Sequence, residues 1–411
     1  MNIPSYIIPI IRRLEECGFE AYLVGGCVRD DAMGRLPNDY DITTNALPGD
    51  MLRVFADHRV IETGLKHGTL TVMSEGEPLE ITTYRIDGEY TDNRHPDSVS
   101  FTDDITLDLS RRDFTVNAMA YSPTLGLMDP FGGMKHLKER RIVCVGSPTA
   151  RFNEDGLRIL RALRFASVLD FTIDPATSHA VRSECHLLRG ISKERIFVEL
   201  TKLLCGVGAK GILRDYPDIL AICADGVTAK AFASCADKVA KLPKGDYVSR
   251  LALLCRISAD EVSADSGKLA VNYMNSLKSS AADRKRCRTL TEAAATDYPA
   301  DKFAVKRLMG RLDRDDVYAY AAIRLALTGD FTAHGEFLKL YESVAATDPC
   351  VKISSLRITG NDVMEITGVR GAEVGRLLGE LLDEVIDEKL TNSRGELEAY
   401  LIKKRLGDGN K

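Results

Sequence analysis

The feature that most constrains the fold is a change in the spacing of apolar residues near residue 150. Before it, short runs rich in β-branched residues, separated by glycine or turn residues, predict strands at 21–24, 39–44, 68–73, 78–84, 114–121 and 142–145. After it, Leu, Ala, Arg and Glu recur at three-to-four spacing and predict helices at 157–169, 193–205, 246–256 and 373–388. The sequence therefore predicts an α+β chain, with an α/β head before an all-α remainder that breaks again near 205 and 330.

Composition narrows the class of protein. A length of 411 residues with 45% apolar side chains indicates several core-forming domains. No stretch approaches 18 uncharged apolar residues, and the N-terminal basic pair follows its apolar run, so we expect a cytoplasmic protein without a membrane partner. The ten cysteines include no CxxC pair, which argues against a zinc or redox site. A formal charge of -5 means that any nucleic acid must meet a local basic surface.

The segment from Leu23 to Thr44 carries the first chemical signal. An apolar strand breaks at Gly25-Gly26 and leads into a predicted helix, whose start exposes N–H groups to a phosphate and carries Arg29 one turn on. Asp39 and Asp41 lie in a β-type run, where a period of two puts both carboxylates on one face. Such a pair suits Mg²⁺ that also binds triphosphate oxygens. Each signal alone is more often a structural turn or a surface motif, but the two within 20 residues favour a nucleotide site.

Six ordered motifs now allow a family to be named. They read GGCVRD, DYDITT, RRDFTVNAMA, MDPFGGMKHLKERRI, RFNEDGLRILRALRFA and ISKERIFVELTKLL, and they extend to about residue 205. This series resembles the tRNA nucleotidyltransferases and bacterial poly(A) polymerases of the DNA polymerase beta superfamily. The resemblance implies a catalytic nucleotidyltransferase head with a mixed sheet at 1–148, a helical neck for base selection at 149–205, a helical body at 206–330 and a helical, tRNA-binding tail at 331–411.

The resemblance also implies roles for individual residues. Asp39 and Asp41 would hold the catalytic Mg²⁺ ions. The incoming nucleotide would be bound by Gly26, Arg29 and Arg112, the last of these at its triphosphate. Glu80, in the run PLEITTY, is our candidate for a third catalytic carboxylate, and Asp113 competes with it.

The run NEDGLRILRALR predicts base selection. We expect Asn153 to cap a helix whose first turn holds Asp155, with Arg158 as its neighbour and Arg164 on a different side. Asp155 can accept a hydrogen bond and Arg158 can donate one. Cytosine and adenine present an amino donor beside an unprotonated ring nitrogen, which matches this pair, whereas guanine and uracil present a carbonyl beside an N–H, which does not. The family uses the matching residues in this way, and Arg161 and Arg164 match positions that contact the nucleotide or RNA phosphates. The alternative is a plain helix salt bridge. The family usually has proline where Gly156 stands.

Other segments bear on the exact activity. The run ETGLKHGTLTV looks like the form seen in CCA-adding enzymes, and the polar stretch 86–100, with Asp87, Tyr90, Asp92, Arg94 and His95, predicts a mobile loop of the kind kept by enzymes that add the terminal A. We therefore predict an Mg²⁺-dependent enzyme that extends the tRNA 3′ end from CTP and ATP. An A-adding enzyme, a poly(A) polymerase and a non-catalytic RNA-binding protein remain alternatives, and the oligomeric state stays open.

One motif points to a different ligand but is rejected. The run GVGAKG at 206–211 matches the dinucleotide-binding pattern GxGxxG. It follows a predicted helix instead of a strand, so we expect no dinucleotide site there.

Overall fold

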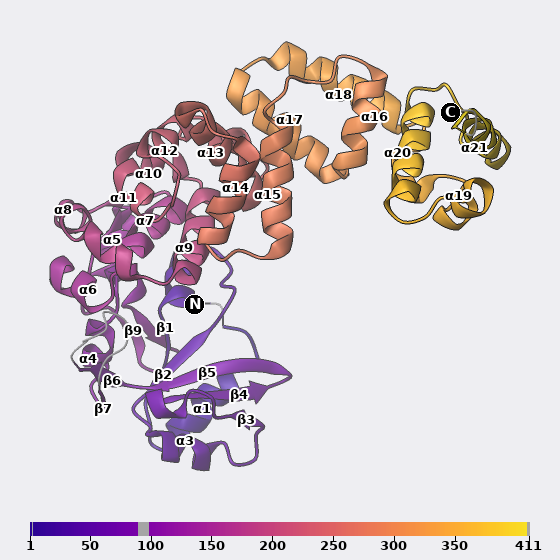
Figure 1. Cartoon of the computed structure of the whole chain (residues 1–411). Coiled ribbons are helices and arrows are strands. Elements are labelled where there is room, and N and C mark those ends of the chain that lie inside the picture. The colour runs from indigo at the N-terminus through magenta and orange to yellow at the C-terminus, as the bar shows by residue number, and fades with distance from the viewer. Residues whose placement is uncertain (2, 89–97, 409–411) are drawn as a thin grey trace. The chain divides into compact units, whose positions relative to one another are not determined.

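The chain divides into two compact units in the computed structural model, which describes residues 1, 3–88 and 98–408. Unit 1 comprises Met1–Ala236 with Ser276–Ser279, and unit 2 comprises Asp237–Asn275 with Ser280–Lys411. Strands are confined to the first part of the chain and helices make up the rest, as the colours of Figure 1 show. This arrangement confirms the predicted fold class, whereas the four-part division of the chain stays a prediction. In the described residues, no helix is long and apolar enough to cross a membrane.

A seven-stranded mixed sheet forms the core of the N-terminal part. Its strands run in the order β3-β4-β5-β2-β1-β8-β9, and only β2 and β5 are parallel neighbours. The strands are β1 (Ala21–Val24), β2 (Asp41–Thr44), β3 (Val60–Ile61), β4 (Thr69–Ser74), β5 (Glu77–Thr83), β8 (Ala120–Ser122) and β9 (Gly126–Met128). Two-stranded pairs are formed by β6 (Arg85–Asp87) with β7 (Val99–Phe101), and by β10 (Arg141–Ile142) with β11 (Thr172–Ile173).

The burial of β1 reflects its central place in the sheet. All four of its side chains are buried between β2 and β8, as expected for a strand covered on both faces, whereas β4 alternates between buried and half-buried side chains. The buried hydroxyl of Thr44 donates to the carbonyl of Glu20 at 2.6 Å, and that of Thr83 donates to the carbonyl of Ala46 at 2.7 Å. These bonds satisfy the polar atoms of β2 and β5 inside the core.

The helices of unit 1 flank this sheet and continue beyond it. They are α1 (Ile8–Glu16), α2 (Gly26–Ala32), α3 (Pro48–Val54), α4 (Ile105–Ser110), α5 (Gly133–Lys138), α6 (Pro148–Glu154), α7 (Leu157–Leu169), α8 (Pro175–Ser183), α9 (Lys193–Cys205), α10 (Ala209–Asp215), α11 (Pro217–Ile222) and α12 (Ala229–Cys235). Helices α7 and α9 pack along each other. A side chain at Gly206 would meet Ser167 Oγ at 2.2 Å, so the glycine of GVGAKG serves close packing against α7.

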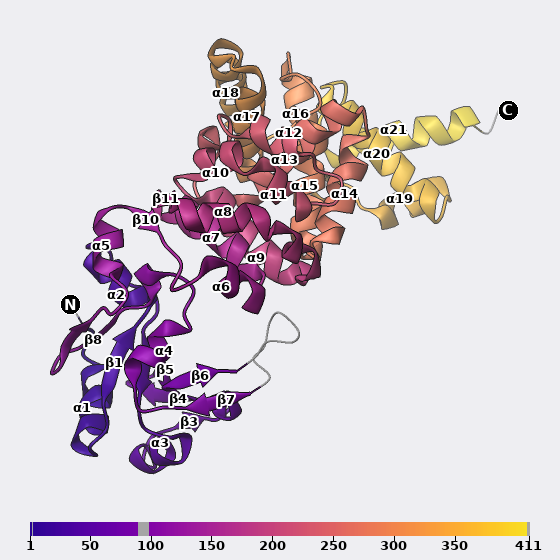
Figure 2. The same cartoon turned by 90° about the vertical axis from the view of Figure 1, so that its left-hand side faces the viewer.

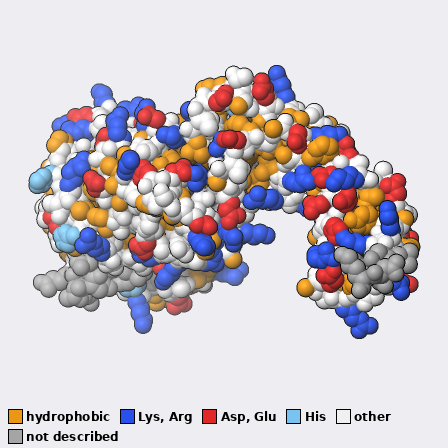
Figure 3. Space-filling view, turned by 45° about the horizontal axis from the view of Figure 1, so that its top comes forward, with side chains coloured by type: hydrophobic (Ala, Val, Ile, Leu, Met, Phe, Trp, Pro, Cys, Tyr) orange, Lys and Arg blue, Asp and Glu red, His pale blue; other side chains and the backbone are white. Residues whose placement is uncertain are grey.

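Unit 2 is all helical in the described residues. It contains α13 (Tyr247–Val262), α14 (Ser266–Ser276), α15 (Ala281–Ala293), α16 (Lys302–Arg311), α17 (Arg314–Thr328), α18 (Phe331–Ala345), α19 (Gly360–Thr367), α20 (Ala372–Ile386) and α21 (Arg394–Asp408). The last three helices surround their own cluster of buried apolar side chains, which includes Leu381, Leu397 and Leu401. On the face drawn in Figure 3, Lys and Arg side chains are interspersed with Asp and Glu.

Several local predictions are wrong. Of the predicted strand 142–145, only Ile142 lies in a strand, at the end of β10. Residues 115–117 of the predicted strand 114–121 form a 3₁₀ turn, and the strand begins only at Ala120. Asn153 does not begin a helix: it lies inside α6, which Ser147 caps, and its amide donates to the carbonyl of Thr149. The ends of the predicted loop 86–100 are not irregular, because β6 and β7 pair as the antiparallel strands seen in Figure 2.

Candidate nucleotide-binding site

A cavity of about 590 Å³ opens within unit 1, beside the ends of β1 and β2. The residues that line it come from six separate stretches of chain. They are Gly25, Gly26, Cys27, Arg29, Asp30, Asn38, Asp39, Asp41, Arg111, Arg112, Asp113, Asn117, Asp155, Leu157, Arg158, Arg161, Arg164, Phe165, Arg195 and Lys202. Every residue predicted for the site is therefore gathered here, except Glu80.

Backbone geometry at Gly25 shapes one wall of the cavity. The residue adopts φ +79°, a conformation that favours glycine, and turns the chain from β1 into α2. A side chain at this position would also meet a terminal nitrogen of Arg112 at 3.2 Å. The GG pair thus lets the start of α2, with Gly26 and Arg29, lie close to the RRD segment.

Charge in the cavity is unevenly matched. Eight basic side chains and five carboxylates line it. Three of the carboxylates pair with arginines of the same cavity: Asp30 with Arg29 at 2.8 Å, Asp113 with Arg161 at 2.6 Å, and Asp155 with Arg195 at 2.7 Å. Asp39 and Asp41 form no ion pair with the described residues, so the two carboxylates predicted to bind metal are those left without a cation.

Repulsion marks Asp41 as a place for a cation. Strand β2 begins at Asp41, so Asp39 precedes the strand instead of sharing its face as predicted, although both line the cavity. Asp41 is the register partner of Glu80 on β5. Burial on its protein side, then the negative charge of Glu80, raise the pKa of Asp41 above its ordinary value, even though the side chain keeps exposed surface toward the cavity. The charge of Arg112 opposes this rise in pKa, and that of Asp39 adds to it.

The donor set fits a divalent ion that shares its ligands with a nucleotide. No group of three or more His, Cys, Asp or Glu side chains is arranged to hold a metal within the part of the chain that the structure describes. Mg²⁺ commonly takes one or two carboxylates and completes its shell with water and substrate phosphates. Asp39 and Asp41 supply that minimum. Glu80 does not line the cavity, so its assignment as a third ligand stays a prediction.

Arg112 offers a guanidinium with spare hydrogen-bonding capacity. One terminal nitrogen lies 3.4 Å from Oδ2 of Asp108, while the buried Nε has no partner among the described residues. Burial lowers the pKa of Arg112, and the charge of Asp108 opposes this effect. Leaving a buried N–H donor without a hydrogen-bond partner costs free energy. An anionic ligand that accepts from Arg112 would remove this cost.

The predicted base-reading pair occupies a break between two helices. Asp155 is extended, with φ -143°, and its Oδ1 caps α7 by accepting from the N–H of Leu157 at 3.0 Å. Arg158, the second residue of α7, donates to Glu154 at 2.5 Å and to the carbonyl oxygens of Arg151 and Arg111 at 3.2 and 3.1 Å. The alternative interpretation was a salt bridge between Asp155 and Arg158. Among the ion pairs of the described residues, Asp155 pairs with Arg195 and Arg158 pairs with Glu154, so the two do not pair with each other. Both side chains remain on the cavity wall.

The arginines further along α7 also reach the cavity. Arg158, Arg161 and Arg164 all line the same space, as expected for residues of one site, although Arg158 and Arg164 bond to different carboxylates. Arg161 is paired with Asp113, whose charge raises the pKa of this guanidinium. Arg164 donates to Glu199 of α9 at 2.5 Å.

Asp113, the alternative to Glu80 as a third catalytic carboxylate, has different surroundings from Asp41. Burial alone would raise the pKa of Asp113, but Arg161 and the amide of Asn117 outweigh it and hold the pKa below its ordinary value. Its Oδ1 also accepts from the N–H of Phe114 at 2.8 Å. Because its oxygens are engaged by the protein, Asp113 fits a positioning role better than a metal ligand.

Sequence reasoning missed several lining residues. Asn117 accepts from Arg29 at 2.6 Å across 88 residues, and Arg195 pairs with Asp155 across 40 residues. Lys202 and Phe165 complete the wall. Contacts at such separations leave no periodic pattern in a single sequence, although all four of these residues lie inside the quoted motifs.

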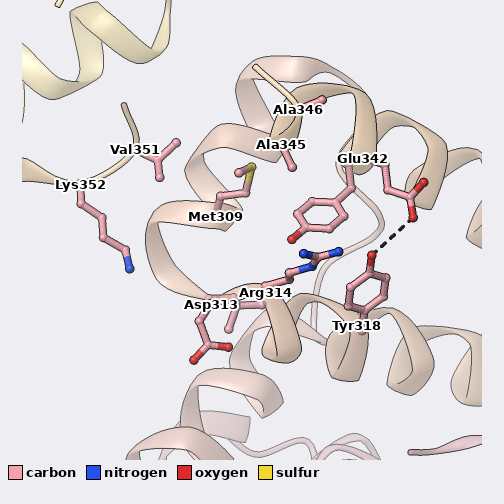
Figure 4. Close-up of a pocket in the computed structure, with 11 residues that line it drawn as sticks. Met309, Asp313, Arg314, Tyr318, Glu342, Ala345, Ala346, Val351 and Lys352 are labelled. Atoms are coloured by element: carbon pink, nitrogen blue, oxygen red, sulfur yellow. Dashed lines mark hydrogen bonds between the residues drawn. The ribbon is translucent and has the colours of Figure 1, made fainter. Parts of the chain in front are cut away.

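A second cavity of about 590 Å³ lies in unit 2 between α16, α17 and α18. Figure 4 shows Tyr318 beside Glu342, to which its hydroxyl donates at 3.4 Å. The lining holds two basic residues, Arg314 and Lys352, and two carboxylates, so it has no surplus of positive charge. Of these two cavities, the one in unit 1 alone combines a surplus of basic side chains with carboxylates that lack ion pairs among the described residues.

Comparison with known proteins agrees with this geometry. A family model described as "Poly A polymerase head domain" matches residues 21–143, and one described as "Probable RNA and SrmB- binding site of polymerase A" matches residues 170–215. The CCA-adding enzyme of Lactococcus lactis subsp. cremoris is 51% identical over 201 residues, which are 48% of this chain, so the matched segment spans only 50% of that relative.

Two further relatives extend over the whole chain. The CCA-adding enzyme of Levilactobacillus brevis is 34% identical over 394 residues, which are 95% of this chain and 96% of that protein. The crystal structure of the Bacillus stearothermophilus CCA-adding enzyme in complex with CTP is 29% identical, covers 100% of both chains and superposes with a TM-score of 0.83. With matched motifs, matched fold and full-length similarity, the chain belongs to the family of CCA-adding enzymes.

Proposed function

We propose that this protein is a cytoplasmic nucleotidyltransferase that adds CCA to the 3′ end of tRNA from CTP and ATP without a nucleic-acid template. The observation that carries the proposal is the charge arrangement of one cavity, where Asp39 and Asp41 lack ion pairs and eight basic side chains surround them in the described structure. A nucleoside triphosphate with a bound cation has the complementary arrangement. Full-length similarity to CCA-adding enzymes favours the complete CCA sequence over A addition alone.

The protein's own groups would divide the work by position. Gly26 and Arg29, at the start of α2, would face the triphosphate together with the partly unsatisfied guanidinium of Arg112. The 3′-hydroxyl of tRNA would attack the α-phosphate in line, and pyrophosphate would leave. The arginines would bind the negative charge that moves onto the leaving group.

A divalent metal ion is used generally by nucleotidyltransferases, and we propose Mg²⁺ held by Asp39 and Asp41. When bound, Mg²⁺ would neutralise phosphate charge and activate the attacking oxygen. The raised pKa of Asp41 supports this site, because a cation would relieve the repulsion from Asp39 and Glu80.

Base choice would fall to Asp155 and Arg158. The carboxylate of Asp155 can accept from the amino group of cytosine or adenine, and Arg158 can donate to the ring nitrogen beside it. Arg195, which holds Asp155 at 2.7 Å, would fix the direction of that acceptor.

One assay tests the proposal. Purified protein is incubated with Mg²⁺ and with tRNA that either lacks its three terminal nucleotides or already ends in CC. CTP, ATP or both are added, and the products are separated at single-nucleotide resolution. We expect two additions to the shorter tRNA with CTP and three with both nucleotides. Extension only of tRNA that already ends in CC would establish an A-adding enzyme, a long A tail would establish a poly(A) polymerase, and no extension of any substrate would contradict catalysis.

A further inference from the structure

The ring of Phe165 is surrounded by positive charge. The guanidinium carbons of Arg29, Arg161 and Arg164 lie 5.4 Å, 5.3 Å and 3.5 Å from its centroid. An aromatic face attracts cations within about 6 Å, because the ring carries negative charge on its faces. Three cavity arginines therefore share one aromatic neighbour.

These arginines come from different parts of the site. Arg29 lies on α2 and follows the glycine pair, whereas Arg161 and Arg164 lie on α7. Their charges repel one another, and polar partners hold each of them: Asp30 and Asn117 for Arg29, Asp113 for Arg161, and Glu199 for Arg164, with Glu199 also 3.8 Å from Arg161. The ring is the one group that all three approach in common among the described cation–aromatic contacts.

The ring itself is held firmly. Phe165 lies on α7 with 6% of its surface exposed, and it meets the fully buried ring of Phe114 at 5.7 Å and an interplanar angle of 75°. Phe114 directly follows Asp113 of the RRD segment, so the contact joins α7 to the part of the head that carries Arg112. With so little free surface, Phe165 can affect a nucleotide mainly through the arginines around it.

We propose that Phe165 is a positioning residue that holds Arg29, Arg161 and Arg164 in the spacing that receives the phosphates of the incoming nucleotide. This inference rests on the proposed function, since it concerns the same cavity. It separates two tasks: the ring sets the affinity for the triphosphate, which CTP and ATP share, while Asp155 and Arg158 set the choice of base.

The test varies the charge of the ring without changing its shape. Phenylalanine analogues with one, two and three ring fluorines are incorporated at position 165 of the full chain, because fluorine withdraws negative charge from the ring face. Calorimetric titration with CTP and with ATP then gives the dissociation constants. We expect both to rise stepwise to about tenfold with the third fluorine, while the ratio of CTP to UTP affinity and the tRNA affinity stay unchanged.

Ordinary substitutions provide the controls. Phe165→Leu should weaken CTP binding about as much as full fluorination. It should raise KM for both CTP and ATP with little change in kcat. Phe165→Tyr, which keeps the ring, should bind CTP nearly as well as the wild-type protein. Phe171→Leu is the matched control, because Phe171 is also buried and lies 5.8 Å from the guanidinium of Arg140, yet does not line this cavity. Phe171→Leu should leave CTP binding at the wild-type value.

The outcomes separate the two hypotheses. A wild-type protein that binds neither CTP nor ATP would contradict the proposed function. If the wild-type protein binds CTP but the dissociation constant does not change across the fluorinated variants, the role of Phe165 is overturned and the proposed function stands. Equal losses for Phe165→Leu and Phe165→Tyr would also overturn it, because they would show that shape alone matters.

Discussion

At the scale of single residues, the site includes a carboxylate that disfavours its own charged form. Burial, Glu80 and Asp39 raise the pKa of Asp41, so ionising it costs more in the folded than in the unfolded protein. For an acid with a raised folded pKa, stability decreases as pH rises from the unfolded pKa through the folded pKa, and the loss persists above it. Asp41 should therefore destabilise the metal-free protein at neutral pH.

The first prediction follows from this sign. Asp41→Asn should lower kcat by at least about 100-fold, because the metal loses a ligand, and should raise the melting temperature of the metal-free protein at pH 7. Calorimetric melts at pH 7 and below pH 4, with chelator present, measure the second effect, which should disappear at low pH. Asp39→Asn should lower kcat in the same way, because Asp39 is the other proposed metal ligand. A melting temperature lowered at pH 7 would contradict the account.

Asp113 gives a prediction of opposite sign. Its pKa is lowered, mainly by Arg161 acting against burial, so it stabilises the fold above its unfolded pKa, and this contribution disappears as pH falls through the folded value. Asp113→Asn should destabilise unit 1 by about 3 kcal/mol at pH 7, because Arg161 loses its carboxylate partner. Urea unfolding of both proteins should show this difference at pH 7 and a smaller one below pH 3. A difference independent of pH would refute the role of charge.

At the scale of elements, local pattern was sufficient where an element carries its own signal. The apolar period predicted the bounds of α7 and α9 correctly, because each helix buries one continuous stripe. The strand prediction at 114–121 failed because Thr115–Asn117 are drawn into a 3₁₀ turn by distant contacts, including the bond between Thr115 and His136. The partners of Asp155 and Arg29 were missed for the same reason, since they lie 40 and 88 residues away.

Asp155, between α6 and α7, allows the effect of a mutation on base choice to be separated from its effect on stability. Asp155→Ala removes both the acceptor and the cap on Leu157, whereas Asp155→Asn keeps a capping oxygen. Asp155→Ala should relax discrimination against UTP or GTP by about 1–3 kcal/mol, and Asp155→Asn should relax it with less loss of stability. Ratios of kcat/KM for the four nucleotides measure this. Uniformly lower activity with unchanged ratios would mean that Asp155 only supports the helix.

The pair β6 and β7 defines a further element. The polar stretch 86–100 begins in β6 and ends in β7, and Tyr90, Asp92, Arg94 and His95 lie outside the described residues. We predict that shortening the chain within 89–97, with both strands kept, leaves addition of two cytidines nearly normal and stops before the terminal adenosine. Gel analysis on tRNA lacking CCA and on tRNA ending in CC measures each step. A complete CCA end made at the wild-type rate would refute this role.

At the scale of the whole molecule, the candidate nucleotide cavity belongs to one unit. Every residue that lines the nucleotide cavity lies in unit 1, and α19, α20 and α21 have a separate apolar core. A chain that ends at Asp348 should therefore bind CTP with unchanged affinity, whereas its KM for tRNA should rise at least about tenfold if the tail binds tRNA as predicted. Calorimetry with CTP and initial rates with tRNA measure the two effects. An unchanged KM for tRNA would remove the tail from RNA binding.

The surplus of basic residues in the cavity also bears on how a reaction cycle ends. Eight cations that receive a triphosphate would hold the departing pyrophosphate almost as well, since both ligands carry several charges in a small volume. Product release would then limit turnover, and rising salt would speed turnover at saturating CTP while slowing capture at low CTP. Under these conditions the cell's removal of pyrophosphate, as much as the supply of CTP and ATP, would determine how fast tRNA ends are completed.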